Sequence, residues 1–229
     1  MRRFKRNILI FSVVFVPITF SLGLWQLERA EEKNEIIAEF EKLQQMPSVD
    51  LLDVLQIKNW QPVYANGQYE DFILYEDNAI LEGRAGYRIY HLFRIEDKRY
   101  IFVNRGFLER KQTKNDLPFV NTPKTPFKIN GYILQKANNE FVSNVEEKNP
   151  LVIQQLNFTE LSMRYPELRD KEVLPYLFNL LPSDINKFKS IEKPINMSSA
   201  THIGYAIQWF GLCLALLIMT FLVLRKNER

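Results

Sequence analysis

Residues 201–226 read THIGYAIQWFGLCLALLIMTFLVLRK, and this stretch determines the fold class. It is continuously apolar from about Gly204 onward, and it lies in a charge-free run from Pro194 to Leu224. An α-helix rises 1.5 Å per residue, so about 20 apolar residues cross the hydrocarbon core of a bilayer. The stretch therefore predicts a transmembrane helix, and His202, one of only two histidines in the chain, lies at its start.

A second apolar run lies near the other end of the chain. No charged residue occurs from Asn7 to Leu27, so this run is also long enough to span a membrane. It is longer than the apolar region of a usual signal peptide and lacks a small-x-small cleavage site before LGLWQLER, so we expect it to be retained. Pro17 in its middle is tolerated because neighbouring groups can satisfy the freed carbonyl. The 229 residues then leave room for one domain between two spans.

Basic residues flank both apolar runs on the sides of the chain ends. They are Arg2, Arg3, Lys5 and Arg6 before the first run, and Arg225, Lys226 and Arg229 after the second. Because basic flanks stay in the cytoplasm, the predicted segments are a cytoplasmic N-terminus (1–7), a transmembrane helix (8–27), a periplasmic α+β domain (28–200), a second transmembrane helix (201–224) and a cytoplasmic C-terminus (225–229). The basic flank follows directly from Met1 without an organellar presequence, which favours the bacterial cytoplasmic (inner) membrane and a multi-pass protein.

Composition argues against several classes of function. The middle segment has a slight excess of acidic residues, so nucleic acid is not an expected partner. Cys213 is the only cysteine, which excludes an intramolecular disulfide and leaves this residue as a small packing group. The GxSxG, P-loop, GxGxxG and HExxH motifs are absent, and we expect no enzyme. His91 lies in a strand pattern and is predicted to be a structural histidine.

The middle segment is predicted to be an α+β domain with a mainly antiparallel β core that curls toward a barrel. A helix continues from the first apolar run and ends before Pro47, and Ser48 is the predicted cap of a short helix over 50–55. Five segments rich in β-branched and aromatic residues are the predicted strands: PVYANGQY (62–69), FILYEDNAIL (72–81), GYRIYHLFRI (86–95), KRYIFVNRGF (98–107) and PFKINGYIL (126–134). The alternation within 87–94 indicates a strand with both faces partly covered.

Turn and loop signals complete this expectation. Asn66–Gly67, Glu96–Asp97 and Asn104–Gly106 are predicted turns or strand ends. NFTELSMRYPEL (157–168) is predicted to be helical, whereas 174–196 is interrupted by prolines and is predicted to be a loop that returns to the membrane.

Polar and aromatic residues collect where each apolar run meets the middle domain. The first cluster holds Gly23, Trp25, Gln26, Arg29 and Lys33, and the second holds His202, Gly204, Tyr205, Gln208 and Trp209. Helical spacing puts His202, Tyr205 and Trp209 on one stripe. Each residue also has a plainer explanation, since aromatic residues form interfacial belts, glycines allow close helix packing and glutamines bond across helices. Two such clusters at one membrane surface indicate a site.

The pairing of LGLWQLER with HIGYAIQWF resembles the surfeit-locus protein 1 family, whose members assist assembly of cytochrome c oxidase. The match continues in order through PVYANGQY, GRAGYRIYHLF, IFVNRGF and INGYIL, and only 170–193 matches poorly. Three positions depart from the family pattern. Phe107 stands where tryptophan is usual and keeps an aromatic plug, His91–Leu92 replaces proline–leucine, and Thr201 stands where asparagine is common.

The resemblance implies an assembly factor for a haem-copper oxidase that binds haem a and assists its insertion into the large oxidase subunit. His202 is the implied iron ligand, Gly204 leaves room for the ring, and the propionates lie near Arg29, Lys33 or Arg105. The implied cofactor-binding set is His202, Tyr205, Trp209, Gln208, Gly204, Trp25, Gln26, Arg29 and Arg105.

The implied partners are the large oxidase subunit and membrane lipid, with haem a synthase as a further candidate. The alternative to a haem carrier is a haem-free membrane scaffold that stabilises an oxidase assembly intermediate. In that case His202 only packs or caps the helix end.

Overall fold

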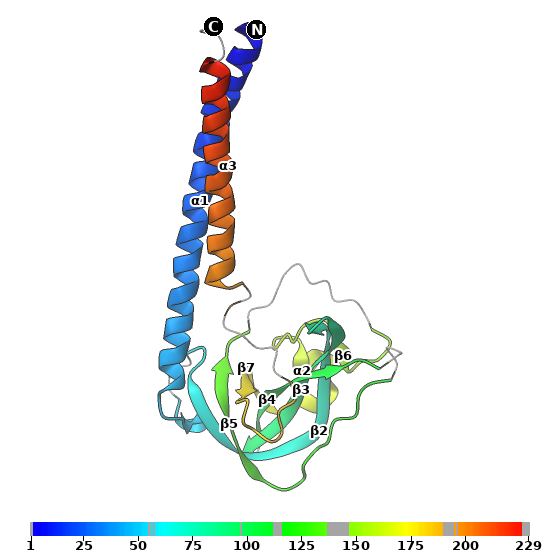
Figure 1. Ribbon diagram of the computed structural model, residues 1–229. Coiled ribbons are helices and arrows are strands. Elements are labelled where there is room, and N and C mark those ends of the chain that lie inside the picture. Colours follow the sequence, from blue (N-terminus) through cyan, green and yellow to red (C-terminus); the bar gives the residue numbers. More distant parts are fainter. Residues whose placement is uncertain are drawn as a thin grey trace. The chain divides into compact units, whose positions relative to one another are not determined.

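The computed structural model describes residues 2–54, 56, 58–96, 98–111, 116–136, 147–189, 195 and 197–225. The chain divides into two compact units, Met1–Glu41 with Lys193–Arg229, and Lys42–Glu192. Its elements are α1 (Arg2–Gln44), β1 (Val49–Asp50), η1 (Leu51–Asp53), β2 (Pro62–Leu81), β3 (Arg84–Glu96), β4 (Arg99–Glu109), β5 (Phe127–Leu134), β6 (Val152–Ile153), α2 (Leu161–Arg164), η2 (Pro166–Leu168), β7 (Glu172–Leu180) and α3 (Ser199–Arg225) (Figure 1). Two long apolar helices at the ends and a mostly antiparallel sheet between them confirm the predicted fold class.

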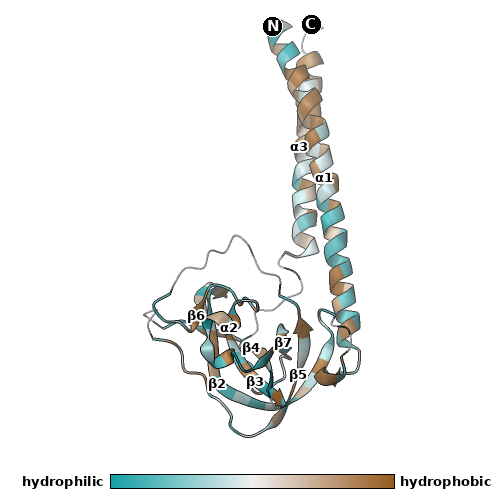
Figure 2. Ribbon diagram, turned by 180° about the vertical axis from the view of Figure 1, so that it is seen from behind, coloured by the Kyte–Doolittle hydropathy of each residue, from teal (hydrophilic) through white to brown (hydrophobic). Residues whose placement is uncertain are grey.

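Helices α1 and α3 are each long and apolar enough to cross a membrane. Hydrophobic residues dominate α3 and the first half of α1, whereas the second half of α1 is mainly hydrophilic (Figure 2). Helix α1 passes Pro17 and Leu27 without a break and stops at Gln44, which confirms a helix that ends before Pro47. The predicted boundaries between membrane and outer segments stay predictions, and 226–229 of the predicted C-terminus lie outside the described residues.

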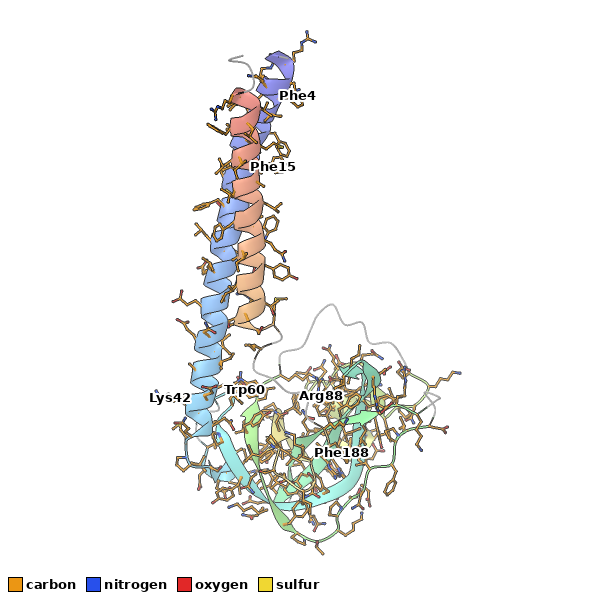
Figure 3. All side chains as sticks on the ribbon, viewed as in Figure 1. Phe4, Phe15, Lys42, Trp60, Arg88 and Phe188 are labelled. Atoms are coloured by element: carbon orange, nitrogen blue, oxygen red, sulfur yellow. The ribbon has the colours of Figure 1, made fainter. Side chains whose placement is uncertain are left out.

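The two helices form an antiparallel pair (Figure 1). Contacts between them include a hydrogen bond from Lys5 Nζ to the Leu224 carbonyl (2.8 Å), a hydroxyl pair of Ser12 and Thr220, a Cys213 Sγ contact to the Val16 carbonyl (3.8 Å), and the rings of Phe20 and Phe210 (5.6 Å between centroids). Residue numbers rise along α1 as they fall along α3, which defines the antiparallel direction. Phe4 and Phe15 instead project from the outside of the pair (Figure 3).

Small and polar residues form the seam of this pair. The buried seam residues are Ser12, Thr19, Gly23 and Ala30 on α1, and His202, Ala206, Cys213 and Thr220 on α3. Spacings of seven and four keep one stripe of each helix facing the other, as in a coiled coil. Small side chains let two helices approach closely in a membrane, where packing rather than water exclusion drives association. Cys213 is therefore a buried packing residue, as predicted.

Five strands close into a barrel. Strand β2 pairs with β3, β3 with β4, β4 with β7, β7 with β5, and β5 returns to β2. Only the β4–β7 pair is parallel among these five. The long β2 makes closure possible because its first part, 62–67, pairs with β5 and its second part, 68–81, pairs with β3. The prediction of a mainly antiparallel core that curls toward a barrel is confirmed.

Strand β3 is buried on both faces. Phe93 belongs to a cluster contributed by all five barrel strands, which fills the barrel interior. Tyr90 and Leu92 point the other way, into a second cluster with Leu161 and Tyr165, so α2 and η2 cover the outside of the sheet. Because both faces of the strand are covered, apolar side chains point to both of them, as the alternation in 87–94 predicted.

Two hairpins join β2, β3 and β4. The turn predicted at Glu96–Asp97 lies between β3 and β4, with Asp97 itself outside the described residues. Glu82 and Gly83 connect β2 to β3 with φ values of 53° and 77°. Two successive positive φ values are typical of a type I′ turn, whose twist matches that of paired strands.

The prediction of a turn at Asn66–Gly67 is wrong. Both residues lie inside β2, opposite Lys128 and Phe127 of β5. A Cβ atom on Gly67 would lie 1.9 Å from the Arg94 carbonyl oxygen. Glycine is required here because the backbone of β3 approaches too closely for a side chain, at the point where β2 changes partner.

The prediction of a loop over 174–196 is wrong for its first part. Glu172–Leu180 forms β7, between β4 and β5, and Phe178 is fully buried in the barrel core. Pro175 lies where the β4–β7 register shifts, so its missing N–H falls in an irregular part of the ladder. Residues 190–194 and 196 of the predicted loop lie outside the described residues.

The short helices differ from the prediction in cap and length. Over 50–55 the chain forms only the 3-10 helix η1, and Asp50 rather than Ser48 caps it by accepting from the Leu52 N–H at 3.0 Å. The helix predicted over 157–168 is reduced to α2 and the 3-10 helix η2. Pro166 separates them because its ring cannot continue an α-helix.

The strand end predicted at Asn104–Gly106 is wrong, because β4 continues beyond it. Gly106 pairs with Ile89 and Asn104 pairs with Tyr90, so Arg105 is an extra residue in a β-bulge. The bulge is closed by the Gly106 N–H, which donates to Asn104 Oδ1 at 3.0 Å.

Gly106→Ala is expected to cost about 2 kcal/mol more in unfolding free energy than the matched change Gly83→Ala. Both glycines have positive φ, 104° and 77°, so both substitutions strain the backbone. A Cβ on Gly106 would also lie 2.4 Å from the Lys189 carbonyl oxygen, whereas a Cβ on Gly83 has no neighbour within 4 Å. Urea unfolding of the full chain in detergent measures the difference, and equal midpoints for the two variants would contradict it.

Candidate functional site

His202 lies in the first turn of α3. The Ser198 hydroxyl accepts from the Thr201 N–H at 3.3 Å and bonds the Thr201 hydroxyl at 2.9 Å, so Ser198 caps the helix. The family departure at Thr201 thus leaves a capped helix start. The His202 side chain is 8% exposed and faces α1 within the helix pair.

His202 and Gln26 are in direct contact. Gln26 Oε1 lies 2.8 Å from His202 Nδ1, across the seam between α1 and α3. An amide oxygen only accepts hydrogen bonds, so Nδ1 carries the hydrogen and donates it. His202 Nε2 is buried and has no hydrogen-bond partner among the described residues. In the neutral ring, this nitrogen holds the free lone pair.

The seam explains why these two residues meet. Gln26 lies three residues beyond Gly23, and a Cβ on Gly23 would lie within 2.5 Å of the Phe210 ring. Close packing at that point brings α1 and α3 together one turn away from the contact between Gln26 and His202. Both residues were predicted at the same membrane surface, but their contact was not predicted. The seven-residue spacing of small residues in both helices is the signal that predicts the pairing.

The other residues of the two clusters lie around this contact in different environments. Trp25 is 50% exposed and Tyr205 is 43% exposed, so both rings are on the outside of the helix pair. Trp209 is half-buried, and Gln208 is exposed. The stripe predicted for His202, Tyr205 and Trp209 therefore runs from the seam to the outer surface rather than along one buried face.

Gly204 lies beside open space. A Cβ at this position would have no neighbour within 4 Å, so helix packing does not require this glycine. His202 faces α1, and positions two residues apart do not share a helix face, so the room predicted for a flat ring at Gly204 stays a prediction.

Arg29 lies in acidic surroundings. Its guanidinium pairs with Glu32 one turn along α1. A shallow hollow on this helix is lined by Trp25, Glu28, Arg29, Glu31, Glu32 and Glu35. Four carboxylates around one guanidinium disfavour a further anion, which weighs against a propionate at Arg29. Lys33 is half-buried on the same helix.

Arg105 belongs to the barrel unit and is 3% exposed. It donates to the carbonyls of Asn186 (2.8 Å) and Asn121 (2.7 Å) and to His91 Nδ1 (3.0 Å). Its guanidinium also lies 4.9 Å from the centroid of the Tyr69 ring. These contacts give Arg105 a structural role, in which it ties the loops around Asn121 and Asn186 to β3. The cofactor role predicted for it stays a prediction.

His91 is a satisfied histidine inside the barrel, as predicted. It is fully buried and stacks on Tyr69 with 4.3 Å between ring centroids. Arg105 donates to Nδ1, so the Nε2–H donates to the Glu70 carbonyl at 2.8 Å. Burial, and then the charge of Arg105, lower the pKa of His91 to about 3. In a neutral ring, these hydrogen bonds place the hydrogen of His91 on Nε2 and that of His202 on Nδ1.

Phe107 keeps the aromatic plug expected at the family's tryptophan position. It is 4% exposed, and its N–H donates to the Lys189 carbonyl at 2.7 Å. Phe188, next to Lys189, lies among the barrel side chains (Figure 3) and places its ring 4.6 Å from the Arg105 guanidinium. The NRGF segment therefore anchors the chain that follows β7.

Comparison with known proteins extends these observations to nearly the whole chain. The model of the SURF1 family matches residues 13–214. A SURF1-like protein of Rickettsia felis is 23% identical over 235 residues, which cover 97% of this chain and 98% of the relative. Surfeit locus protein 1 of Gallus gallus is 26% identical and that of Rattus norvegicus 27% identical, over 94% and 95% of this chain and 74% and 75% of the relatives. This chain belongs to the SURF1 family, whose members are known as cytochrome oxidase assembly factors.

Proposed function

We propose that this protein assists assembly of a haem-copper cytochrome oxidase by holding haem a at His202 and passing it to the large oxidase subunit. The observation that carries the proposal is His202 Nε2, a buried nitrogen for which the described part of the chain offers no hydrogen-bond partner, on a ring whose other nitrogen is hydrogen-bonded to Gln26. A buried polar atom without a partner is costly, and in native proteins such an atom is often reserved for a ligand or catalytic role.

A single histidine fits haem iron better than a bare metal ion. Haem supplies four porphyrin nitrogens itself, so one protein ligand would be enough to hold it. In the part of the chain that the structure describes, no three His, Cys, Asp or Glu side chains converge to hold an ion. When bound, haem a would supply the iron centre, and the neutral imidazole of His202 would supply the electron pair. Tyr205 or Trp209, at i+3 and i+7 from His202, would pack against the ring.

The proposed setting is the bacterial cytoplasmic membrane, with both termini in the cytoplasm and the barrel in the periplasm. The basic residues at both chain ends support this orientation. His202 would then lie near the outer membrane surface, where the apolar farnesyl tail of haem a can stay in lipid. A carrier of this kind catalyses no reaction and needs only intermediate affinity, because very tight binding would trap its cargo. Haem a synthase is the proposed source of the haem.

A haem-free scaffold is the second candidate. His202 is mostly buried and joins α3 to α1 through Gln26, so its side chain also contributes to holding the helix pair together. In this case the helices and the barrel would stabilise an oxidase intermediate without carrying its cofactor.

His202→Ala is expected to abolish haem a binding, because no other side chain of the site offers an imidazole. The measurement is the reduced absorption spectrum of the detergent-purified full chain, co-expressed with haem a biosynthesis. Thr220→Ala is the matched control, because it removes a polar seam contact at the other end of the pair and is expected to keep the haem band. A folded parent that carries no haem although haem a is made would refute the carrier, and normal oxidase assembly in the His202→Ala strain would then favour the scaffold.

A further inference from the structure

We propose that Gln26 is a positioning residue that fixes the ring tautomer of His202 and thereby presents Nε2, rather than Nδ1, as the haem-iron ligand. The inference rests on the proposed function and assigns a role to a residue that does not touch the iron. The proposed role of Gln26 predicts that Nε2 is the ligating atom and that the His202 ring already carries its hydrogen on Nδ1 before haem binds.

The hydrogen bond between the two side chains carries this inference. Gln26 Oε1 is 2.8 Å from His202 Nδ1, and the amide oxygen can only accept. A free neutral imidazole exchanges its hydrogen between the two nitrogens, and the hydrogen bond made by one nitrogen decides which of them is free to bind metal. With Oε1 facing the ring, Gln26 therefore holds the hydrogen on Nδ1 and leaves the lone pair on Nε2, a buried nitrogen without a partner among the described residues.

The helix pair holds both residues in place before any ligand binds. Ala206 lies one turn after His202 on the buried stripe of α3, and Ala30 lies one turn after Gln26 on the buried stripe of α1. Rigid helices position a ligand and its supporting partner more precisely than loops do. The contact is thus a feature of the apo protein.

The chemistry of the acceptor suits a carrier. A carboxylate that accepts from a ligating histidine raises the basicity of the ring and strengthens its bond to the metal. Gln26 provides a neutral carbonyl instead, so the imidazole stays a moderate donor. A moderate iron–nitrogen bond permits transfer to the oxidase subunit, which a bond supported by a carboxylate would slow.

The first test uses the apo protein and needs no haem. The full chain is labelled with nitrogen-15 at histidine, purified in detergent, and its ring-nitrogen shifts are recorded at pH 8. The parent is expected to show one hydrogen on Nδ1, from His202, and one on Nε2, from His91, which serves as the internal reference. Gln26→Leu is expected to shift the His202 signals toward the other tautomer and leave His91 unchanged. A His202 hydrogen on Nε2 in the parent, or an unchanged spectrum in Gln26→Leu, would overturn the proposal.

The second test uses haem a titrated into the same proteins. Gln26→Leu is expected to weaken haem binding by about 10- to 100-fold, the range found when partners that orient metal ligands are removed. Gln26→Glu is expected to bind haem at least as tightly as the parent and to release it more slowly than the parent. Asn34→Leu removes an exposed amide from the same helix outside the seam and is the matched control, with affinity equal to the parent.

The outcomes of the two tests separate the two proposals. A parent with the predicted tautomer that binds no haem would refute the proposed function, whereas a parent that binds haem as tightly as Gln26→Leu would refute the positioning role.

Discussion

Replacing Arg105 by methionine is expected to lower the unfolding free energy of the barrel by about 3 kcal/mol. The methionine fills a similar volume but donates to none of the three acceptors that Arg105 satisfies, namely His91 Nδ1 and the carbonyls of Asn121 and Asn186. His91 is fully buried, so its Nδ1 would lose the Arg105 donor without gaining water. The cation–π contacts to Tyr69 and Phe188 would also be lost.

The matched control is Arg84→Met. Arg84 also pairs with an acceptor, Glu109 at 2.9 Å, but both side chains are more than half exposed. Exposed ion pairs contribute at most about 1 kcal/mol, so this variant is expected to unfold close to the parent. Urea unfolding of the full chain in detergent, followed by near-ultraviolet circular dichroism, compares the two. A similar small loss in both variants would show that the Arg105 contacts add nothing beyond a surface pair.

Amide hydrogen exchange tests in which segments Arg105→Met destabilises the barrel. Arg105 joins the loops around Asn121 and Asn186, so Arg105→Met is expected to speed amide exchange in 116–126 and 181–189 more than in β5. Uniform acceleration over the barrel would point to general destabilisation instead.

The helices and most strands follow from local sequence, whereas the special positions of the barrel do not. Charge-free runs at both ends leave no structure other than a long helix that satisfies its own backbone inside a membrane. Alternating apolar residues fix β3 and β4 for a similar reason, since one face must turn to each core. These signals are periodic and repeat over many residues, so they survive local exceptions.

Asn66–Gly67 and Asn104–Gly106 show why the exceptions were misread. Both contain the asparagine and glycine that mark turns, yet each lies inside a strand. Gly67 is required because the backbone of β3 approaches it closely. Gly106 is required because it lies in a bulge and because the backbone at Lys189 packs against it. These partners lie far along the sequence, so no local pattern can distinguish such glycines from turn glycines.

The site was only half predictable for a related reason. Residue type and membrane depth identified His202 and Gln26 as members of two clusters. Their contact depends on which stripe of each helix faces the other, which the small residues of the seam decide. Arg105 was grouped with them by its charge, but its bulge turns it into the barrel, where neutral acceptors surround it.

Acidification is expected to destabilise the barrel through His91. The pKa of this ring is about 3 in the folded chain, because burial and then the charge of Arg105 disfavour the imidazolium, against 6.5 when unfolded. Between these values the unfolded chain binds a proton that the folded chain does not, so stability is highest above about pH 6.5 and falls as the pH decreases toward 3. The linkage relation gives a loss of about 2 kcal/mol between pH 7.5 and pH 5, and of the order of 4 kcal/mol by pH 3.

The window from pH 7.5 to pH 5 isolates this effect, because ordinary carboxylates titrate below it. His91→Asn keeps an acceptor near the position of Nδ1 for Arg105 but removes the titrating ring, so its unfolding free energy is expected to be lower at pH 7.5 and nearly constant down to pH 5. Urea unfolding at four pH values measures these slopes. An unfolding free energy of the parent that does not change with pH would mean that His91 accepts a proton in the folded barrel, where Arg105 turns away to make room. The same conclusion would follow if His91→Asn kept the pH dependence of the parent.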